Sequence, residues 1–563
     1  MKEIIEITDL KDMLKKTGKA FGKRPAYKIK KENGYKIITH KEVREMVDGL
    51  GTALINLGLK GKRIAVIGEN RYEWEIAYLA ITCGTGIVVP LDKSLPENEL
   101  KRLIERSQVE AIFYTKKYEE ILKRILLSNT GKLKHLISMD EEKHTKGRYS
   151  EKELIETGKK LIEQGKKEFI TAQINSEEMQ IMLFTSGTTS EPKVVGLTHK
   201  NLCSNLMEIA KALDIDETDR ILSFLPIHHV FECTVGFLYS LYVGAQTSFC
   251  DGIRHILENL NEYQITFAAF VPAIYENMYK NLMRKLEKEG KYENTLKLME
   301  QHRNDSMEEK KKIFKDIHKI FGGNIKLFVS GAASLDPNVE QGFRDLGINL
   351  CQGYGLTETS PVIGVETNKE YKVGSIGKAL PNLQVKIIDA DKNGMGELVV
   401  KGPSIMKGYF ENDKATKEVL EDGWFKTGDL ATIDEEGYIF IKGRKKSVIV
   451  LKNGKNIFPE EMESLVNRIE GVKESFIYGK SNKKDKDDIR IYLKMVIDPE
   501  IIKNSYKVKS NEEIYETMKK QVKEINKTMP AYKAIRGIKV TEEPLIKTTT
   551  GKIRRQEEIK TVE

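Results

Sequence analysis

A short polar stretch rich in hydroxyl groups follows a run of apolar residues. The stretch "TSGTTSEPK" spans Thr185 to Lys193 and comes directly after "IMLF". Glycine lets a backbone approach anionic oxygens, Ser and Thr hydroxyls donate hydrogen bonds, and lysine neutralises charge, so the stretch could bind nucleotide phosphates. The Walker spacing G-x-x-x-x-G-K-[ST] and the serine-nucleophile pattern G-x-S-x-G are both absent from the chain, which disfavours those two classes. Taken alone, the stretch could equally be an ordinary polar turn.

The composition is typical of a soluble chain with several folding units. The chain has 563 residues, of which 40% are hydrophobic and 31% are charged, and this length predicts two to four domains. No signal-peptide pattern opens the chain, so we expect a cytoplasmic protein. Five widely spaced cysteines without a C-x-x-C pair favour reduced thiols. The uncharged segment from Cys233 to Cys250 approaches the length of a membrane span, but its polar residues and glycines favour a buried helix and a strand.

Positive charge is concentrated in the last fifth of the chain. The net charge is +9, and the residues from Arg444 to the end hold 28 Lys and Arg against 19 Asp and Glu, so the remainder is balanced. A basic module favours an anionic partner, such as a nucleic acid, a membrane surface or a polyphosphate ligand. A solubilising surface is the simpler interpretation of the charge by itself.

The hydrophobic pattern predicts strands that alternate with helices. "RIAVIGENRYEWEIAYLAITCGTGIVVPL" reads as strand, helix and strand, and "VEAIFY", "TFAAFVP" and "IKLFVSGAA" are further strands separated by helices. This alternation indicates a mostly parallel sheet covered on both faces. The charged segment from Tyr275 to Ile320 is expected to be a solvated helical hairpin. After about Gly374, short strands joined by Gly, Asn and Asp turns predict a small β-rich subdomain, and a compact α+β unit runs to the end.

Motifs further along the chain strengthen the phosphate-binding interpretation. "TSGTTSEPK" resembles the phosphate loop of the adenylate-forming enzymes, the superfamily of acyl-CoA synthetases, peptide-synthetase adenylation domains and luciferases. Seven more motifs of that superfamily follow in the same order: "LPIHHVFE", "SGAASL", "QGYGLTETS", "GELVVKG", "TGDLA", "GRKKSVIVLKNGKNIFPEEME" and "KTTTGKIRR". The resemblance covers nearly the whole chain. "NRYEWEIAYLAI" and "VVPLDKSLPENELKRLIERS" make it most similar to the long-chain fatty-acid:CoA ligase branch.

The resemblance implies a fold class and a division into domains. We expect an α/β protein with a large N-terminal domain, residues 1–443, of mostly parallel sheets covered by helices, including a β-rich subdomain at about 374–443. A small mobile α+β C-terminal domain, residues 444–563, is expected to close over it as a lid. The hinge is expected near Lys445 and Lys446, since a hinge needs only a few residues to absorb a rotation.

The resemblance also implies a reaction in two steps. A carboxylate attacks the α-phosphate of ATP to give an acyl-adenylate and pyrophosphate, and the thiol of coenzyme A then attacks the acyl carbon and releases AMP. Cations must offset the repulsion between the two anions of the first step, because electrostatic stabilisation is usually the largest catalytic term. We therefore expect ATP, Mg²⁺ and coenzyme A as cofactors and a medium- or long-chain fatty acid as substrate. Nucleic acid is not an expected partner, whereas a homodimer and peripheral contact with the inner membrane surface stay open.

Individual roles follow from the same resemblance. Lys552 is expected to bridge the substrate carboxylate and the α-phosphate, and Glu358 and Thr185 to bind Mg²⁺ with their hard oxygen ligands. His229 is expected to line the carboxylate and acyl pocket rather than to act as a strong base, because Cys233 stands where the acyltransfer pattern H-H-x-x-x-D has its aspartate. The helix after it is a candidate wall of the acyl tunnel, through Val235, Gly236, Phe237 and Ser240.

The nucleotide and coenzyme A contacts are also implied by the family motifs. Tyr354 is expected to stack on adenine, and Asp429 and Arg444 to bind the ribose. The β- and γ-phosphates are expected to contact Thr185, Ser186, Gly187, Thr188, Thr189 and Lys193. The other nucleotide contacts are expected from Gly331, Ala332, Ala333, Gln352, Gly353, Gly355 and Thr357, and the coenzyme A tunnel from Leu451 to Ile457, which includes Gly454 and Lys455.

Two positions of the phosphate loop depart from the family. Ser190 and Val194 stand where relatives have glycine, and the loss of glycine is expected to stiffen the loop. This departure keeps open a catalytically silent protein that binds nucleotide or acyl groups. Independently of it, an enzyme of this fold that loads the phosphopantetheine of a carrier protein also stays open.

Overall fold

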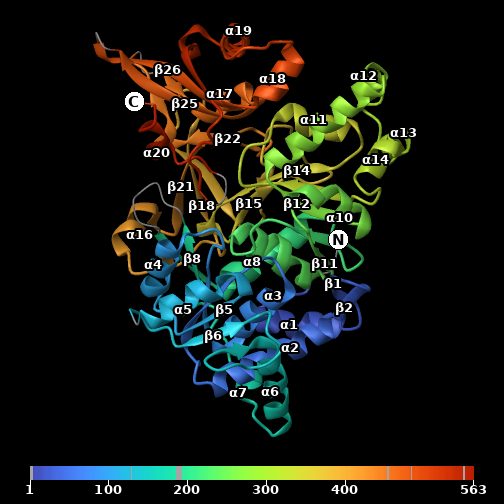
Figure 1. The fold of residues 1–563 in the computed structure, drawn as a ribbon, viewed down its shortest axis with the longest axis vertical. Helices are drawn as coiled ribbons and strands as arrows, with labels where there is room; N and C mark the ends of the chain where they lie inside the picture. The colour runs from blue at the N-terminus through green and yellow to red at the C-terminus, as the bar shows by residue number, and fades with distance from the viewer. Residues whose placement is uncertain are drawn as a thin grey trace.

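Two large sheets form the body of the molecule (Figure 1). The computed structural model describes residues 4–128, 130–185, 193–452, 455–482, 485–548 and 552–562. Both large sheets lie in the N-terminal part of the chain, and the C-terminal part sits above them, coloured orange to red at the top of Figure 1. The α/β class is confirmed.

The first large sheet contains eight strands in the order β19-β9-β8-β4-β3-β5-β6-β7. The strands from β8 to β7 run parallel, and β9 and β19 add antiparallel pairs at one edge. The predicted strand, helix and strand at the start of this sheet are confirmed as β3, α3 and β4. The strands are β3 (Lys62–Ile67), β4 (Gly86–Pro90), β5 (Ala111–Tyr114), β6 (His135–Ser138), β7 (Tyr149–Ser150), β8 (Met179–Thr185), β9 (Lys193–Thr198) and β19 (Gly408–Tyr409). The helices of this part are α1 (Leu10–Ala20), α2 (His40–Asn56), α3 (Tyr72–Ala80), α4 (Glu97–Ser107), α5 (Glu119–Leu127), α6 (Glu151–Glu163) and α7 (Glu168–Thr171).

The second large sheet contains nine strands in the order β16-β15-β14-β13-β12-β10-β11-β1-β2. Its centre from β14 to β1 is parallel, and both edges are antiparallel. The strands are β1 (Pro25–Lys31), β2 (Gly34–Thr39), β10 (Arg220–Ser223), β11 (Gln246–Phe249), β12 (Phe267–Phe270), β13 (Leu327–Ser330), β14 (Leu350–Gly355), β15 (Val362–Val365) and β16 (Lys378–Ala379). The helices are α8 (His199–Ala212), α9 (Tyr239–Val243), α10 (Ile256–Glu262), α11 (Pro272–Lys288), α12 (Tyr292–Gln301), α13 (Met307–Ile313), α14 (Lys315–Ile320) and α15 (Pro337–Asp345).

Buried helices fill the main core. All residues of α3 from Trp74 to Ala80 are buried, including Glu75, whose carboxylate accepts a hydrogen bond from the Tyr27 hydroxyl at 2.5 Å. The Trp74 ring stacks on Tyr78 with centroids 5.6 Å apart, and both rings meet the edge of Phe237. Phe237 belongs to a π-helical segment, Glu232–Leu238, that continues into α9. The main core therefore joins a helix of the first sheet to one of the second.

The uncharged segment from Cys233 to Cys250 lies inside the protein. It forms the π-helical segment, α9 and then β11, so the expected buried helix and strand are confirmed. In the described part of the chain, no helix combines the length and hydropathy that a bilayer crossing requires. The charged segment from Tyr275 to Ile320 is helical as predicted, and α11 packs Leu282 and Leu286 into a core of its own with β12 and β13.

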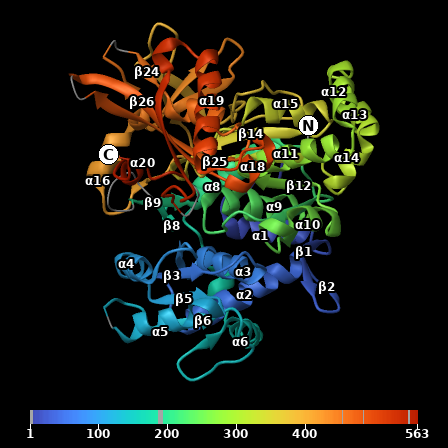
Figure 2. The ribbon, with the colours of Figure 1, turned by 45° about the horizontal axis from the view of Figure 1, so that its top comes forward.

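Smaller sheets make up the rest of the chain. A five-stranded sheet comprises β17 (Gln384–Ile388), β18 (Gly396–Lys401), β20 (Leu420–Glu421), β21 (Trp424–Ile433) and β22 (Ile439–Arg444), with α16 (Asp413–Val419) between β19 and β20. The C-terminal part contains β23 (Ile449–Val450), β24 (Asn456–Ile457), β25 (Val472–Asn482), β26 (Asp485–Ile497) and β27 (Ile535–Thr541), together with α17 (Pro459–Val466), α18 (Pro499–Tyr506), α19 (Asn511–Thr528) and α20 (Arg555–Ile559). Figure 2 shows these elements as one orange and red body beside α11 and α15. The domain limits and the hinge stay predictions.

Candidate active site

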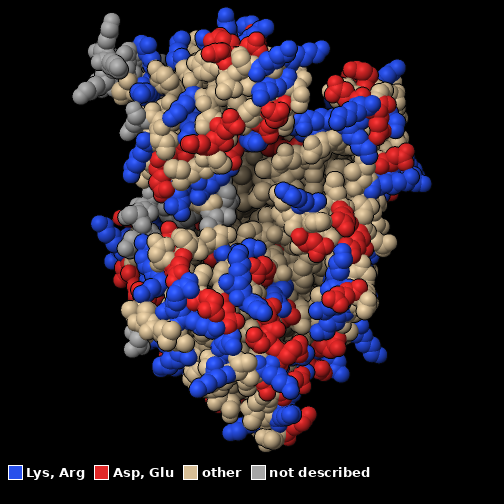
Figure 3. All heavy atoms as spheres, viewed as in Figure 1, with Lys and Arg blue, Asp and Glu red and all other residues tan. Residues whose placement is uncertain are grey.

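A large cavity separates the C-terminal part from the two large sheets. Its volume is about 3290 Å³, and Figure 3 shows the molecule hollowed at its centre beneath the C-terminal part. The described residues that we expected to act in catalysis or to bind the nucleotide, Mg²⁺ or coenzyme A, and that line this cavity, are Thr185, Lys193, His229, Gly331, Ala332, Ala333, Gln352, Gly353, Tyr354, Gly355, Thr357, Glu358, Asp429, Arg444, Lys455 and Lys552. The other predicted contacts, namely Ser186, Gly187, Thr188, Thr189 and Gly454, lie outside the described residues, as does Ser190.

One corner of the cavity brings a lysine and a carboxylate to the same tyrosine. Thr185 ends β8 opposite Lys193 of β9, and the Thr185 hydroxyl donates to the Lys193 carbonyl at 3.3 Å. The Lys193 ammonium lies 4.4 Å from the centre of the Tyr409 ring, and the Tyr409 hydroxyl donates to Glu358 Oε1 at 2.9 Å. Burial and the neighbouring Glu358 carboxylate raise the pKa of Tyr409, so it stays a hydrogen-bond donor. Tyr409 therefore fixes the distance between the cation and the carboxylate.

Val194 contributes to packing at the position where relatives have glycine. Its side chain is buried in a core of the first sheet, next to Phe184 and Phe410. A glycine here would leave that volume unfilled, which gives the substitution a structural reason. The expected stiffening of the loop that precedes it stays a prediction.

A second corner holds an aspartate between a tyrosine and an arginine. Asp429 of β21 lies opposite Arg444 of β22, and the two form an ion pair in which Arg444 Nε lies 2.8 Å from Asp429 Oδ1. The Tyr354 hydroxyl, at the end of β14, donates to the other carboxylate oxygen. One carboxylate oxygen thus already accepts a hydrogen bond and the other lies beside a cation, so a ribose would have to use the remaining lone pairs or displace Tyr354. Burial raises the pKa of Asp429, while the Arg444 charge opposes the rise.

The wall between these corners is shaped by glycines. A Cβ atom at Gly331 would lie 2.8 Å from the Phe231 ring, and one at Gly355 would lie 1.9 Å from the Pro361 carbonyl oxygen. Ala332 follows Gly331 with a φ of 70°, in the left-handed region that non-glycine residues seldom occupy. The glycines therefore let this wall pack closely against Phe231 and the Pro361 carbonyl, and Tyr354 lines the same cavity.

His229 is a neutral member of the cavity lining. Its Nδ1 accepts a hydrogen bond from the Phe231 amide at 3.3 Å. Burial, followed by the charges of Lys552 and His228, lowers the pKa of His229 to about 3. A neutral imidazole with so low a pKa is a poor base, which agrees with the expectation that His229 does not act as a strong base. The neighbouring His228 has its Nε2 3.4 Å from Asp92 Oδ2.

Lys552 reaches the same cavity from the C-terminal part. It lies in a turn in which the Thr548 amide donates to the Lys552 carbonyl at 2.8 Å, and its side chain is open to the water of the cavity. The surrounding protein still lowers the pKa of Lys552, first by desolvation and then through the Arg444 charge, while Asp429 and Glu358 oppose this. The ammonium group thus lies within electrostatic reach of both corners.

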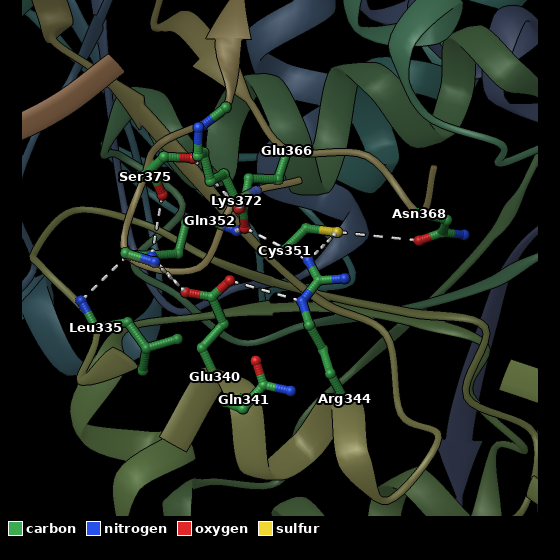
Figure 4. Close-up of polar contacts among 12 residues, drawn as sticks. Leu335, Glu340, Gln341, Arg344, Cys351, Gln352, Glu366, Asn368, Lys372 and Ser375 are labelled. Atoms are coloured by element: carbon green, nitrogen blue, oxygen red, sulfur yellow. Dashed lines mark hydrogen bonds and ion pairs between the residues drawn. The ribbon is translucent and has the colours of Figure 1, made fainter. Parts of the chain in front are cut away.

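Gln352 lines the cavity, but its side-chain amide binds other protein groups, and the expected contact with the nucleotide stays a prediction. Its side-chain amide donates to Glu340 Oε2 at 2.8 Å and to the Ser375 carbonyl at 3.1 Å (Figure 4). Its backbone amide donates to Glu366 Oε2 at 2.9 Å. The side chain is committed to a buried network behind the cavity wall, and its effect on a ligand would pass through the position of β14.

That buried network places one guanidinium between two carboxylates. Arg344 lies 3.6 Å from Glu340 and 3.5 Å from Glu366, and its guanidinium carbon lies 3.6 Å from the centre of the Tyr371 ring. Burial, then the Glu340 charge, raises the pKa of Glu366 to about 8, while Arg344 opposes the rise. Sequence reasoning missed these residues and also Tyr409, because no motif marks them; Glu340 lies one helical turn from Arg344, but Glu366 and the Glu358 partner of Tyr409 are more distant in the sequence.

Part of the cavity lining is apolar. It includes Ile209 of α8, Leu213 directly after α8, Val235 of the π-helical segment and Val362 of β15. Of the four residues expected to form an acyl tunnel wall, Val235 borders the cavity. Gly236, Phe237 and Ser240 do not border it; they are buried behind Val235.

Family comparisons cover almost the whole chain. A sequence model described as "AMP-binding enzyme" matches residues 14–410, and one described as "AMP-binding enzyme C-terminal domain" matches residues 446–563. Long-chain-fatty-acid–CoA ligase 6 of Mus musculus is 28% identical over 535 residues, which cover 88% of this chain and 74% of that protein. Long-chain-fatty-acid–CoA ligase FadD15 of Mycobacterium bovis is 26% identical over 463 residues, covering 78% and 75%.

Solved structures share the fold along the full length. The anthranilate CoA ligase AuaEII in complex with anthranoyl-AMP superimposes with a TM-score of 0.78 at 19% identity and covers 100% of this chain and 99% of its own. MatB from Rhodopseudomonas palustris with bound ATP gives a TM-score of 0.75 at 22% identity, with 98% and 99% covered. The cavity, the conserved order of motifs and the two family matches agree, and the chain belongs to the AMP-binding enzymes, the adenylate-forming superfamily that includes the acyl-CoA synthetases.

Proposed function

We propose that the chain is an ATP- and Mg²⁺-dependent acyl-CoA synthetase that acts on a fatty acid of medium or long chain. The observation that carries the proposal is the meeting of Lys552 with Glu358 and Asp429 across one cavity, although more than a hundred residues separate Lys552 from either partner along the chain. A cation at that place can offset the repulsion between a substrate carboxylate and the polyphosphate of ATP.

The two corners suit the two ends of ATP. The phosphates would lie near Thr185 and Lys193, and the adenosine between Tyr354 and the Gly331 wall, with Asp429 and Arg444 at the ribose. In the first step, the Lys552 ammonium would stabilise the substrate carboxylate and the negative charge that develops at the α-phosphate. His229, neutral and beside this position, would shape the entry of the carboxylate without removing a proton.

Mg²⁺ fits the donor set of the phosphate corner. The described residues contain no cluster of three or more His, Cys, Asp or Glu side chains that could hold a metal by themselves. Mg²⁺ is usually bound through one or two protein oxygens together with substrate phosphates, and Glu358 and the Thr185 hydroxyl would supply those oxygens. The ion would neutralise phosphate charge.

The apolar part of the cavity lining supports a fatty acyl substrate. Ile209, Leu213, Val235 and Val362 line the same cavity as His229, and burial of apolar area favours an alkyl chain by about 25 cal/mol per Å². The ligases from mouse and Mycobacterium bovis are named for long-chain fatty acids. Structural neighbours include an anthranilate ligase, which makes the acid itself the first property to test.

The acceptor of the acyl group has a second candidate. A relative from Arabidopsis thaliana, 28% identical over 522 residues, is named as a long-chain-fatty-acid–[acyl-carrier-protein] ligase. Loading of a carrier protein is therefore kept beside coenzyme A. The proposed lid, residues 444–563 with a hinge at Lys445 and Lys446, would present Lys455 to the coenzyme A in the second step. A cytoplasmic location is also proposed.

A screen of acids and acceptors tests the proposal. Pyrophosphate release should depend on fatty acid across acids of two to twenty carbons, and AMP release with coenzyme A alone should need no carrier protein. Release that required a carrier protein would replace the coenzyme A proposal. No pyrophosphate with any of these acids would favour a silent binding protein and overturn the proposed activity.

A further inference from the structure

Two groups of ion pairs connect the C-terminal part to the N-terminal part at the rim of the cavity. Arg468, just after α17, donates through Nε and Nη2 to both oxygens of Asp336, at 2.6 and 2.9 Å. Glu470 pairs with Lys280 at 3.0 Å and also with Arg284, and both of these basic residues lie on α11. All five side chains border the cavity that also contains Lys552.

The geometry of these pairs is more specific than that of a chance surface contact. An arginine that binds a carboxylate with two parallel hydrogen bonds is oriented as well as attracted. Asp336 is buried and held in place by a second contact. It is the N-cap of α15, and its Oδ1 also accepts a hydrogen bond from the Asn338 amide. On the other side, Ile469, which lies between Arg468 and Glu470 in the sequence, is buried in the core of the C-terminal part. Both ends of the contact are therefore anchored in their own part of the molecule.

Asp336 also lies next to the nucleotide wall. It follows the segment from Gly331 to Ala333 by a few residues, on the same connection between β13 and α15. Arg468 therefore holds the C-terminal part against the element that ends the adenosine wall. Any rotation of residues 444–563 about the proposed hinge would separate Arg468 from Asp336 and Glu470 from α11, because the partners belong to different parts.

We propose that these two contacts form a latch that holds Lys552 in the cavity during the first half-reaction. In this assignment, Asp336, Arg468 and Glu470 are positioning residues that act through Lys552, and the latch opens for the attack of coenzyme A. The inference rests on the proposed function and adds to it the residues that set the balance between two lid positions. Exposed ion pairs contribute little to overall stability, but a small bias is sufficient to shift two states of similar free energy.

A double variant, Asp336→Asn with Glu470→Gln, removes the latch charges and retains an oxygen that can cap α15. We expect pyrophosphate release in a single turnover to slow about three- to tenfold. Attack of coenzyme A on preformed acyl-adenylate should be unchanged or faster. Lys503→Gln is the matched control, since Lys503 pairs with Glu500 at 3.0 Å within α18 and bridges no two parts. This control should leave both half-reactions at the rate of the unmodified chain.

A distance measurement separates the latch from the activity. Spin labels on cysteines replacing the exposed Lys297 of α12 and Lys520 of α19, with half-buried Cys250 changed to Ser, report the position of the lid. The unmodified latch should give one dominant distance, and the double variant a second, longer population. This readout remains informative if no acid is activated, so failure of the proposed function is distinguishable from failure of the latch.

Charge exchange gives a test that general destabilisation cannot imitate. Glu470→Lys should open the lid, and the further changes Lys280→Glu and Arg284→Glu should restore both the dominant distance and the rate of pyrophosphate release. An unchanged distance distribution in the double variant would overturn the proposal. Equal loss of both half-reactions, or no restoration by the exchange, would also overturn it.

Discussion

Replacing Lys552 by methionine removes the ammonium group while keeping most of the side-chain volume. Around Lys552 lie the two carboxylates of Glu358 and Asp429 and the single guanidinium of Arg444, so the protein surroundings carry one net negative charge. ATP and a substrate carboxylate would add several more. Two unit charges 4 Å apart interact by about 4 kcal/mol at an effective dielectric constant near 20, before screening and the cost of desolvation. Loss of one preorganised charge contact in a catalytic site typically costs about 2.7–4 kcal/mol, or roughly 100- to 1,000-fold in rate.

The two half-reactions separate this role from a general defect. Pyrophosphate release in a single turnover measures adenylation, and thioester formation from synthetic acyl-adenylate and coenzyme A measures the second step. We expect Lys552→Met to slow the first by about 100- to 1,000-fold and the second by less than about threefold. Lys523→Met, an exposed lysine of α19, is the control and should change neither rate. Equal losses in both half-reactions would refute the reasoning.

The pH dependence of the first step gives an independent check. Desolvation lowers the pKa of Lys552 below its ordinary value, and the protonated form is the one that carries the positive charge. The adenylation rate should therefore fall as pH rises through that lowered pKa, at a lower pH than an ordinary lysine would require. Lys552→Arg keeps its charge across this range, and its residual activity should lack this alkaline fall. A fall of the same shape in the arginine variant would assign the titration to another group.

Three further predictions concern residues that hold the site in place. Tyr409→Phe removes the hydrogen bond to Glu358, and we expect adenylation to fall about 5- to 30-fold, measured by pyrophosphate release against Mg²⁺ concentration, with the thermal midpoint little changed. Gly331→Ala places a Cβ atom 2.8 Å from the Phe231 ring, so we expect a loss of about 1–3 kcal/mol in the free energy of unfolding and a raised KM for ATP; unchanged values would contradict the packing argument. Burial raises the pKa of Glu366 from 4.5 to about 8, so its contribution to stability is complete below pH 4.5 and is lost as pH rises through about 8. Glu366→Gln should flatten this decline in a series of denaturant titrations, and an unaltered slope would show that another group is responsible.

Much of the fold was predictable because its pattern is local. The strand, helix and strand from Arg63 to Leu91 follow from runs of apolar residues and their boundaries, and the structure confirms them. The buried location of the uncharged segment after Cys233 followed from its polar residues and glycines. The assignment of four acyl-tunnel residues was less successful, because a single turn of a buried helix presents Val235 to the cavity and turns Phe237 into the core.

The identities of the site residues were predictable, but the contacts between them were not. The motifs identified Asp429, Arg444 and Tyr354, but no spacing indicates that the tyrosine and the arginine take one carboxylate oxygen each. The motif that contains Gln352 likewise gave no sign that its side-chain amide binds Glu340, since the direction of a side chain depends on whatever is packed behind its strand.

The sequence by itself determined the family, the order of the elements and the chemical groups available for catalysis, because motifs and hydrophobic periodicity are properties of neighbours along the chain. Only the tertiary structure decided which of those groups meet: Lys552 in one cavity with Glu358, Tyr409 between Lys193 and Glu358, and Arg468 on Asp336. The physical reason is that these contacts close loops of tens to hundreds of residues, and their energies depend on distances and burial that arise only once the sheets and the C-terminal part have packed together.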